Sequence, residues 1–356
     1  MRADAVRFEV LPGVAVDILG DDATMRHFQA EYGVTRVPLP GDSTASMRVT
    51  VVLGGPRSAP IDERGVIVGS HKTVSWRAVV GPPDDGRIDA RITLRGRPHW
   101  FGLSLIQGYI VEPLISVAAA AAGGVLLPGA AIVVGPGATI LVGRSRSGKS
   151  SVSARAAAAG LPVLGDDQVH VDRAGMVSRF PRRFRFYDDL SATAPDAYRR
   201  LPARARRALA IRRIIRIASL GFVAPSLPVP ASDLGAVVAP ATGVSRIVVL
   251  ERDRRASRVE LGTLTPGEAA ETAMGILDDQ RRHLRVLGET WRTFLGEIRH
   301  SEADVLRDLL ARVTVERMLI PDALGPAAAV DAVWQQLLRP VDRRDAPESA
   351  TEVDAH

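Results

Sequence analysis

Residues 143–150 read GRSRSGKS and match the pattern G-x-x-x-x-G-K-[ST] at every position. In proteins that carry this pattern, main-chain N–H groups of the loop bind phosphate oxygens, the lysine reaches the β- and γ-phosphates, and the final hydroxyl binds Mg²⁺. Of the 46 basic side chains in the chain, only those at positions 72 and 149 are lysines. A compact ammonium fits a tight backbone cradle in which a planar guanidinium does not fit in the same way. The stretch therefore predicts a phosphate-binding loop.

The residues on either side of the loop predict the order strand, loop, helix, strand. Residues 138–142 (ATILV) form a short apolar run typical of a buried parallel strand. No breaker interrupts residues 149–159, and Gly160 stands where a helix-ending glycine is expected. Residues 162–165 (PVLG) predict the next strand, which ends in the acidic pair at 166–167. Ligands of open α/β sheets bind at such strand ends, so we expect the acidic pair to lie beside the loop.

These positions give a set of candidate site residues. The acidic pair follows a strand, where adjacent side chains point to opposite faces, so one carboxylate is expected to act as a base and the other to hold a metal. Which of the two is the base stays open. Asp166, Asp167 and Lys149 are the catalytic candidates, and Ser150 and Asp167 are the metal candidates. The nucleotide-binding candidates are Gly143, Arg144, Ser145, Arg146, Ser147, Gly148, Lys149, Ser150 and Ser151. The alternatives are a chance match in a Gly- and Ser-rich turn and a solvated Asp-Asp turn.

Composition narrows the class of protein. The chain has 356 residues and a formal net charge of +6, with the positive charge spread almost entirely as arginine. We interpret this bias as a coding preference rather than as a signal for nucleic-acid binding. The absence of cysteine excludes disulfides, thiolate zinc sites and thiol catalysis. No signal peptide is evident near the N-terminus, and we expect a cytoplasmic protein.

An uncharged stretch at residues 113–142 is long enough to cross a bilayer by hydropathy alone. Glycines and prolines divide it into short pieces, and it leads directly into the phosphate-binding motif. It therefore predicts a buried helix followed by two core strands, with no membrane contact.

The rest of the chain divides into three predicted parts. Residues 1–110 are β-rich, with short alternating runs that end in HWFGLSLIQG at 99–108. Residues 111–340 form the domain that carries the motif, and residues 341–356 are a polar tail predicted to be disordered. Further predictions are a helix at 109–122, a loop at 217–240, a strand at 245–250, and helices from Thr265 to about Leu287, from Ser301 and at 327–338.

Two arginine-rich segments follow the acidic pair. Arg182, Arg183 and Arg185 are candidates for contacting a phosphoryl group, and an ordinary solvated surface is the alternative for most of them. Residues 199–216 hold eight arginines on a helical apolar pattern. This segment predicts an exposed helix face, and the alternatives are a basic lid over a nucleotide or a surface for an acidic partner or peptide. Nucleic-acid binding is not expected, because no aromatic interleaving accompanies the charge.

With these motifs the chain resembles the HPr kinase-like family. The likeness rests on EPLISVAAAAAGGVLLPGAAIVVGPGATILVGRSRSGKSS and GLPVLGDDQVHVD, and covers roughly residues 110–290. The resemblance implies an α/β fold with a P-loop kinase core of the phosphoenolpyruvate carboxykinase/HPr kinase-like type, a β-rich N-terminal region and a helical C-terminal part. It also implies ATP and Mg²⁺ at residues 143–150, with one aspartate of the pair as the base for a serine hydroxyl.

The chain departs from that family at three positions. Pro128 stands where relatives usually have His, Arg146 stands where they usually have Gly, and Ser151 stands where true HPr kinases have Glu. HPr itself is therefore not the expected acceptor, and kinases of a biosynthetic peptide or a small molecule are closer. The predicted function is an ATP- and Mg²⁺-dependent kinase acting on a hydroxyl. The rival is a catalytically silent nucleotide-binding sensor or assembly module, and homo-oligomerisation stays open.

Overall fold

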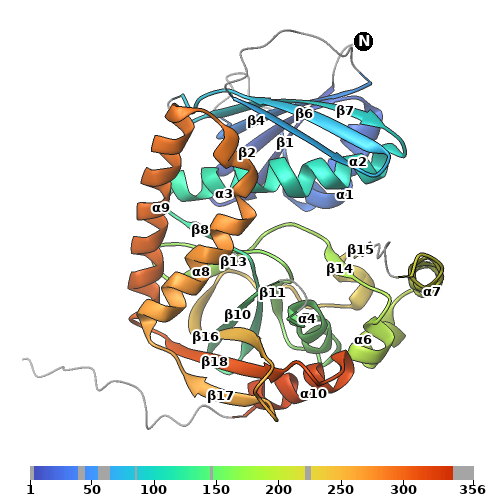
Figure 1. Cartoon of the computed structure of the whole chain (residues 1–356), viewed down its shortest axis with the longest axis vertical. Helices are drawn as coiled ribbons and strands as arrows, with labels where there is room; N and C mark the ends of the chain where they lie inside the picture. The colour runs from blue at the N-terminus through green and yellow to red at the C-terminus, as the bar shows by residue number, and fades with distance from the viewer. Residues whose placement is uncertain are drawn as a thin grey trace, which may run out of the picture.

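The computed structural model describes residues 4–38, 45–54, 65–84, 86–144, 147–220 and 226–339. The chain forms two layers of β-sheet with helices between and around them, one above the other along the long axis (Figure 1). The fold is mixed α/β, as predicted at that level. Ser145, Arg146 and the predicted tail at 341–356 lie outside the described residues.

The upper layer is a mixed sheet of seven described strands. Across the sheet these run in the order β3 (Arg36–Val37), β1 (Asp4–Leu11), β2 (Val14–Gly20), β4 (Met47–Leu53), β7 (Ile88–Gly96), β6 (Val74–Val80) and β5 (Val66–His71). The pairs β2–β4 and β4–β7 are parallel, and the other pairs are antiparallel. Helix α1 (Asp22–Tyr32) packs beside β1 and β2. The predicted β-rich region is confirmed here, whereas α1 and β5 were not predicted.

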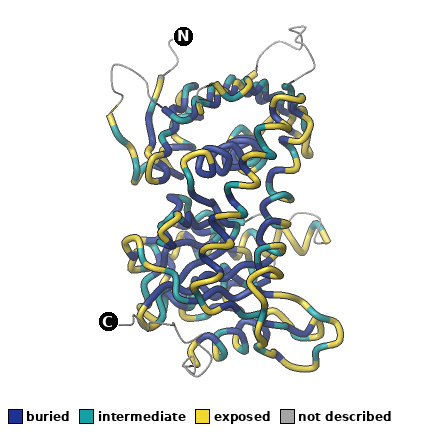
Figure 2. The backbone as a smooth tube through the Cα atoms, turned by 90° about the vertical axis from the view of Figure 1, so that its left-hand side faces the viewer, coloured by how far each residue is buried: buried dark blue, intermediate teal, exposed yellow. Residues whose placement is uncertain are grey.

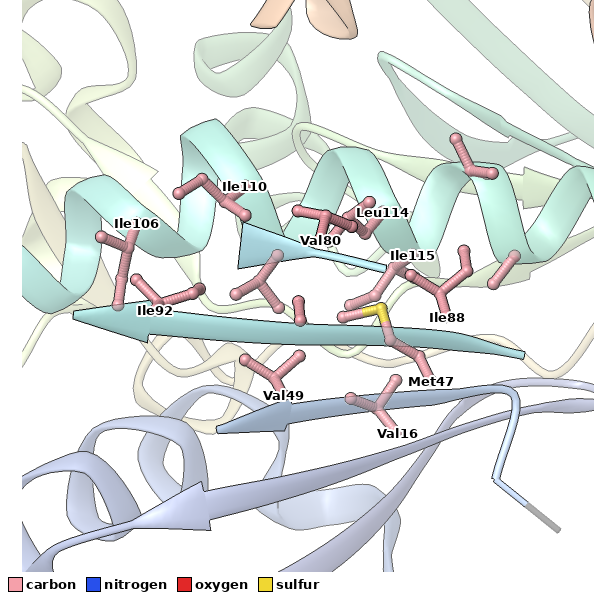
Figure 3. Close-up of a cluster of buried hydrophobic side chains, with 14 of the residues drawn as sticks. Val16, Met47, Val49, Val80, Ile88, Ile92, Ile106, Ile110, Leu114 and Ile115 are labelled. Atoms are coloured by element: carbon pink, nitrogen blue, oxygen red, sulfur yellow. The ribbon is translucent and has the colours of Figure 1, made fainter. Parts of the chain in front are cut away.

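One long helical run covers the inner face of this sheet. It consists of α2 (His99–Ile106), a π-helical turn (Gln107–Val111) and α3 (Glu112–Ala121). Figure 3 shows side chains of the run, among them Ile106, Ile110 and Leu114, packed against residues of the strands. The predicted strand at 99–108 is therefore wrong. The segment is apolar on nearly every side, and buried residues recur at helical spacing at positions 103, 106, 110, 114 and 117.

The same run includes part of the uncharged stretch that is long enough to cross a bilayer by hydropathy alone. Among the described residues, His99–Ala121 is the one helix long and apolar enough to cross a membrane, and 78% of its most apolar window is buried inside the molecule. Such burial is typical of the core helix of a soluble protein. The predicted domain boundary after residue 110 falls inside this continuous run, and α3 packs with the upper sheet.

The lower layer is a mixed sheet of nine described strands organised around β16 (Thr242–Asp253). Its main path is β11 (Val163–Gly165), β9 (Gly129–Val134), β10 (Gly137–Gly143), β16, β13 (Met176–Arg179), β12 (Val169–Val171) and β8 (Val125–Leu127). On its other side β16 pairs with β18 (Thr314–Pro321), which pairs with β17 (Glu260–Thr263). β10 is parallel to β16, as the sequence predicts for residues 138–142. β11 lies two strands from β10, separated by β9.

Helices cover both faces of this sheet. Leu141 points to a core shared with α4 (Lys149–Ala158), α5 (Leu190–Thr193), α6 (Pro195–Arg200) and α10 (Pro326–Leu337). The adjacent Ile140 points to a core shared with α8 (Pro266–Gln280) and the C-terminal half of α9 (Glu289–Leu310). The other half of α9 packs through Trp291 and Ile298 on the upper core, so this helix joins the two layers (Figure 1). Figure 2 shows buried backbone running through both layers.

The C-terminal predictions are confirmed in part. Helix α8 begins at the predicted Thr265 cap, where Thr265 and Glu268 form a reciprocal capping box. Helix α10 lies where a helix was predicted, whereas α9 begins at Glu289 rather than at Ser301. The predicted loop at 217–240 contains the short strand β15 (Leu227–Val229), which pairs with β14 (Phe184–Phe186), in its described part. The basic segment forms α7 (Ala203–Ala218).

Candidate functional site

The motif segment at 143–150 connects β10 to the first turn of α4. Gly148 adopts φ +98°, a left-handed conformation that residues with a side chain rarely adopt. A Cβ on Gly143 would stand 2.9 Å from the carbonyl oxygen of Leu250 and 2.9 Å from Ser147 Oγ. Both glycines of the motif are therefore required by the backbone path. The N–H groups of the first turn of α4 have no helical partners, and such a helix end favours anions.

Lys149 folds back over this loop. Its side chain is largely buried, and Nζ donates to the carbonyl oxygens of Gly143 at 2.6 Å and Arg144 at 2.9 Å, and to Ser147 Oγ at 3.3 Å. Burial lowers the pKa of Lys149, and the charges of Asp167 and Asp166 oppose that shift. The ammonium therefore lies at the loop and within electrostatic reach of the acidic pair.

The two aspartates lie in different surroundings, as the sequence predicts. Asp166 is 7% exposed, and its Oδ2 accepts the Arg185 main-chain N–H at 3.0 Å. The side chain of Ser150 is close enough to act on the pKa of Asp166, which it lowers. Burial, with a smaller contribution from Asp167, raises the pKa of Asp166 to about 7. The side chain of Asp167 is 44% exposed, and its Oδ2 lies 2.7 Å from Arg182 Nη1. One carboxyl is enclosed and the other is open to solvent.

The structure brings Lys149, Ser150, Asp166 and Asp167 into one region. The sequence assigns Ser150 and Asp167 to the metal together, whereas in the structure the Ser150 side chain lies near Asp166 and acts on its pKa. The Ser151 hydroxyl instead donates to Thr193 Oγ1 at 3.0 Å, which ties α4 to α5. Arg144 is exposed at the end of β10. Ser145 and Arg146, both predicted to bind nucleotide, lie outside the described residues.

A chain of polar contacts behind Asp167 was not predicted. Arg182 Nη1 also donates to Glu112 Oε2 at 2.9 Å, and the other oxygen of Glu112 accepts Gln107 Nε2 at 2.8 Å. Gln107 Oε1 in turn lies 2.8 Å from His27 Nε2 of α1. Glu112 is 2% exposed, and burial raises its pKa while Arg182 opposes the shift. This chain of contacts connects the upper layer to the acidic pair of the lower layer.

A second contact between the layers involves Glu31 of α1. Its Oε1 accepts from Arg183 Nη2 at 2.6 Å and from Arg185 Nη2 at 3.2 Å. All three arginines that the sequence singled out after the acidic pair are therefore engaged with carboxylates in this structure. One sequence signal pointed to this region: Glu112 is the only Asp, Glu, Lys or Arg between Arg97 and Arg144.

Replacing Glu112 by alanine is expected to lower the free energy of unfolding by about 3–5 kcal/mol, because it leaves the guanidinium of Arg182 with one partner fewer in a largely buried site. Urea unfolding measures the change. Asp304→Ala provides the matched control, since Asp304 forms an exposed ion pair with Arg307 at 2.7 Å and its loss is expected to cost under about 1 kcal/mol. Equal effects of the two substitutions would show that Glu112 has no special structural role.

The residues present fit a magnesium ion accompanied by phosphate. No group of three or more His, Asp or Glu side chains converges in the described part of the chain, so the protein does not supply a complete metal cage there. Mg²⁺ commonly binds one or two carboxylates, substrate phosphates and water rather than such a cage. Asp166 Oδ1 is buried without a hydrogen-bond partner, and the side chain of Ser150 lies near the same carboxyl group. An unsatisfied carboxylate oxygen in that position suits a hard cation.

No protein-family model matches the chain, and no curated protein matches it by sequence.

Proposed function

We propose that this protein is an ATP- and Mg²⁺-dependent kinase of the HPr kinase-like type that transfers the γ-phosphoryl group to a hydroxyl. The acceptor is a serine of a peptide or protein, or a small-molecule alcohol. The observation that carries the proposal is the position of Ser150 and Asp166. The Ser150 side chain lies near a buried carboxyl group that has one oxygen without a hydrogen-bond partner, and Lys149 is within electrostatic reach of the same group.

The proposal gives each residue one task. Lys149 and the loop N–H groups bind the β- and γ-phosphates, and Ser150 and Asp166 hold Mg²⁺. When bound, Mg²⁺ neutralises charge on the phosphoryl oxygens. Asp167, the more exposed carboxylate, accepts the proton of the acceptor hydroxyl. Arg182 keeps Asp167 in place, and buried Glu112 keeps Arg182 in place. Phosphoryl transfer depends mainly on positioning and charge neutralisation, so few protein groups are needed.

The affinity for Mg²⁺ and nucleotide is expected to depend on pH through Asp166. With a pKa of about 7 in the metal-free protein, this carboxyl is protonated below pH 7 and must lose its proton to bind the cation. Affinity should therefore fall about tenfold per unit as the pH drops below 7 and level off above it. Titration calorimetry over this range measures the effect. The Asp166→Asn variant, measured in the same way, should show only the pH dependence that comes from protonation of the nucleotide. If the affinity of the wild type varied with pH in the same way as that of the variant, Asp166 would not be the group that binds the cation.

The test of the function is incubation with ATP, Mg²⁺ and a panel of peptide and small-molecule alcohols, analysed by mass spectrometry for an added phosphate. The proposal predicts a phosphorylated acceptor with the wild type and none with Lys149→Arg. Panel members differ in charge and size, so the accepted compounds also define the acceptor class.

A silent nucleotide-binding module is the second candidate, and two observations favour it. Arg182 already holds Oδ2 of Asp167 in an ion pair, and Pro128 stands where the resembled family usually has a histidine. Such a module would bind ATP and ADP equally well and would form no phosphorylated product from any acceptor in the panel. A product that depends on Lys149 excludes it.

A further inference from the structure

The second half of helix α7 projects into solvent. The first half is anchored by Ala205 and Leu209, which are buried against the lower layer. From Ala210 to Ala218 every residue except Arg212 is exposed. Figure 1 shows α7 at the edge of the molecule, beyond α6. The helix therefore extends well past the part that the protein itself covers.

The exposed half of α7 is apolar along one side. At about 100° per residue, Ile211, Ile214, Ile215 and Ile217 fall within an arc of roughly 160°. These four residues are termed the isoleucine face; their exposed fractions are 56%, 65%, 41% and 62%. Leu220, just beyond the helix, is 96% exposed. A run of large aliphatic side chains in contact with water is unusual for a helix of a monomeric protein.

In the second half of α7 the arginines of the polar side, rather than the isoleucines, contact the rest of the protein. Arg212 Nε donates to the carbonyl oxygen of Ser226 at 3.2 Å. Arg216 Nε lies 2.9 Å from Asp188 Oδ2. Surface helices ordinarily bury the apolar side and expose the charged side. Because the orientation is reversed here, the isoleucine face is presented outward, as expected of a surface that another molecule covers.

The positive charge around the isoleucine face favours a negatively charged protein partner over a second copy of the chain or lipid acyl chains. No Asp or Glu occurs from residue 197 to residue 232, while eight arginines lie at 199–216. Within the described part of the chain Arg207 and Arg213 form no ion pair, and both are exposed. A second copy of this helix would bring the same positive charge to the contact. Arg207 lies on the same side of the helix as the isoleucines, so insertion into lipid acyl chains would bury a guanidinium. Carboxylates of a protein partner can pair with it.

We propose that the isoleucine face binds an acidic amphipathic segment of a partner polypeptide. The aliphatic side chains of the partner cover Ile211, Ile214, Ile215 and Ile217, and its carboxylates pair with Arg207 and Arg213. This is the packing of one amphipathic helix on another, with anchors at helical spacing. The proposed binding does not require phosphoryl transfer, so a negative test of the kinase activity would not contradict it.

The test uses a fluorescein-labelled peptide of about 20 residues, long enough to form a helix, with Leu on one side and Glu on the other. Fluorescence anisotropy is expected to show micromolar binding that weakens as salt is raised. Ile214→Asp and Ile217→Asp should each weaken binding at least about tenfold, because a charge replaces an apolar contact. Val286→Asp makes the same change at a position that is 61% exposed and away from α7, and should leave binding unchanged.

Three results would overturn the proposal. The first is no binding, or equal binding of a peptide in which Lys replaces every Glu. The second is a wild type that self-associates in light scattering while Ile214→Asp is monomeric, which would mean that a second copy covers the face. The third is binding to phosphatidylserine vesicles that Ile214→Asp abolishes and that the acidic peptide does not compete with. Circular dichroism of each variant confirms that the helix content is retained.

Discussion

Replacing Lys149 by alanine is expected to lower the rate of phosphoryl transfer at least about 10²–10³-fold, the usual cost of removing one aimed donor from a charged transition state. Nζ contacts three oxygens of the loop, so it lies where the β- and γ-phosphates are proposed to bind. The folded state should survive, because burial already disfavours this ammonium, as its lowered pKa shows. The rate of ADP formation and the midpoint of thermal unfolding measure the two expectations.

The two lysines of the chain allow a charge-conserving control. Lys149→Arg keeps the positive charge but replaces a compact ammonium by a planar group that does not fit the loop in the same way, so the rate should fall nearly as far as with alanine. Lys72→Arg makes the identical change in the turn between β5 and β6 of the upper layer and should retain full activity. If both arginine variants were fully active, Lys149 would have no role at the phosphates.

Asp166→Asn is expected to abolish the magnesium dependence of nucleotide binding and to lower transfer by roughly 10²–10³-fold, since a metal supplies several kcal/mol of charge stabilisation. The variant keeps the shape of the side chain, but its amide is a poor ligand for a hard cation. In the metal-free protein it should fold well, because the raised pKa shows that the buried carboxylate is disfavoured there. Calorimetric titration of nucleotide with and without Mg²⁺ measures the difference.

Asp167→Asn tests the other half of the pair. This variant should keep magnesium-dependent nucleotide binding and lose transfer, because its carboxylate is open to solvent and is proposed to act on the acceptor. The opposite pattern, in which Asp167→Asn loses the magnesium dependence and Asp166→Asn keeps it, would restore the pairing of Ser150 with Asp167 that the sequence first suggests.

The local part of the site was predictable from the sequence because its residues lie close together along the chain. The motif, the strand before it and the helix after it span residues 138–159, and the acidic pair follows one strand later. The carboxylates that hold the neighbouring arginines come from far away: Glu112 lies 70 residues from Arg182, and Glu31 lies 152 residues from Arg183. No local sequence pattern predicts such contacts. The single charge of Glu112 in an otherwise uncharged run did indicate that this residue has a buried partner.

The errors in secondary structure have a physical pattern. Residues 99–108 form a helix that is apolar on nearly every side, and such apolar runs lack the periodicity that separates helix from strand. The sequence predicts a start at Ser301, too late for α9, because the first turns of this helix are mostly polar. Their apolar residues, such as Trp291 and Ile298, pack on the core of the upper layer instead. β18 was missed because polar Glu316 and Arg317 interrupt its apolar pattern, and Glu316 pairs with buried Arg246.

Titration calorimetry with a non-hydrolysable ATP analogue tests the central claim most directly, since that claim is that residues 143–150 and Asp166 hold a magnesium-bound triphosphate. The wild type is predicted to bind the analogue with micromolar affinity only when Mg²⁺ is present, and Lys149→Arg is predicted to bind it at least about 100-fold more weakly. No heat of binding from the wild type, or the same affinity in both proteins, would contradict the account.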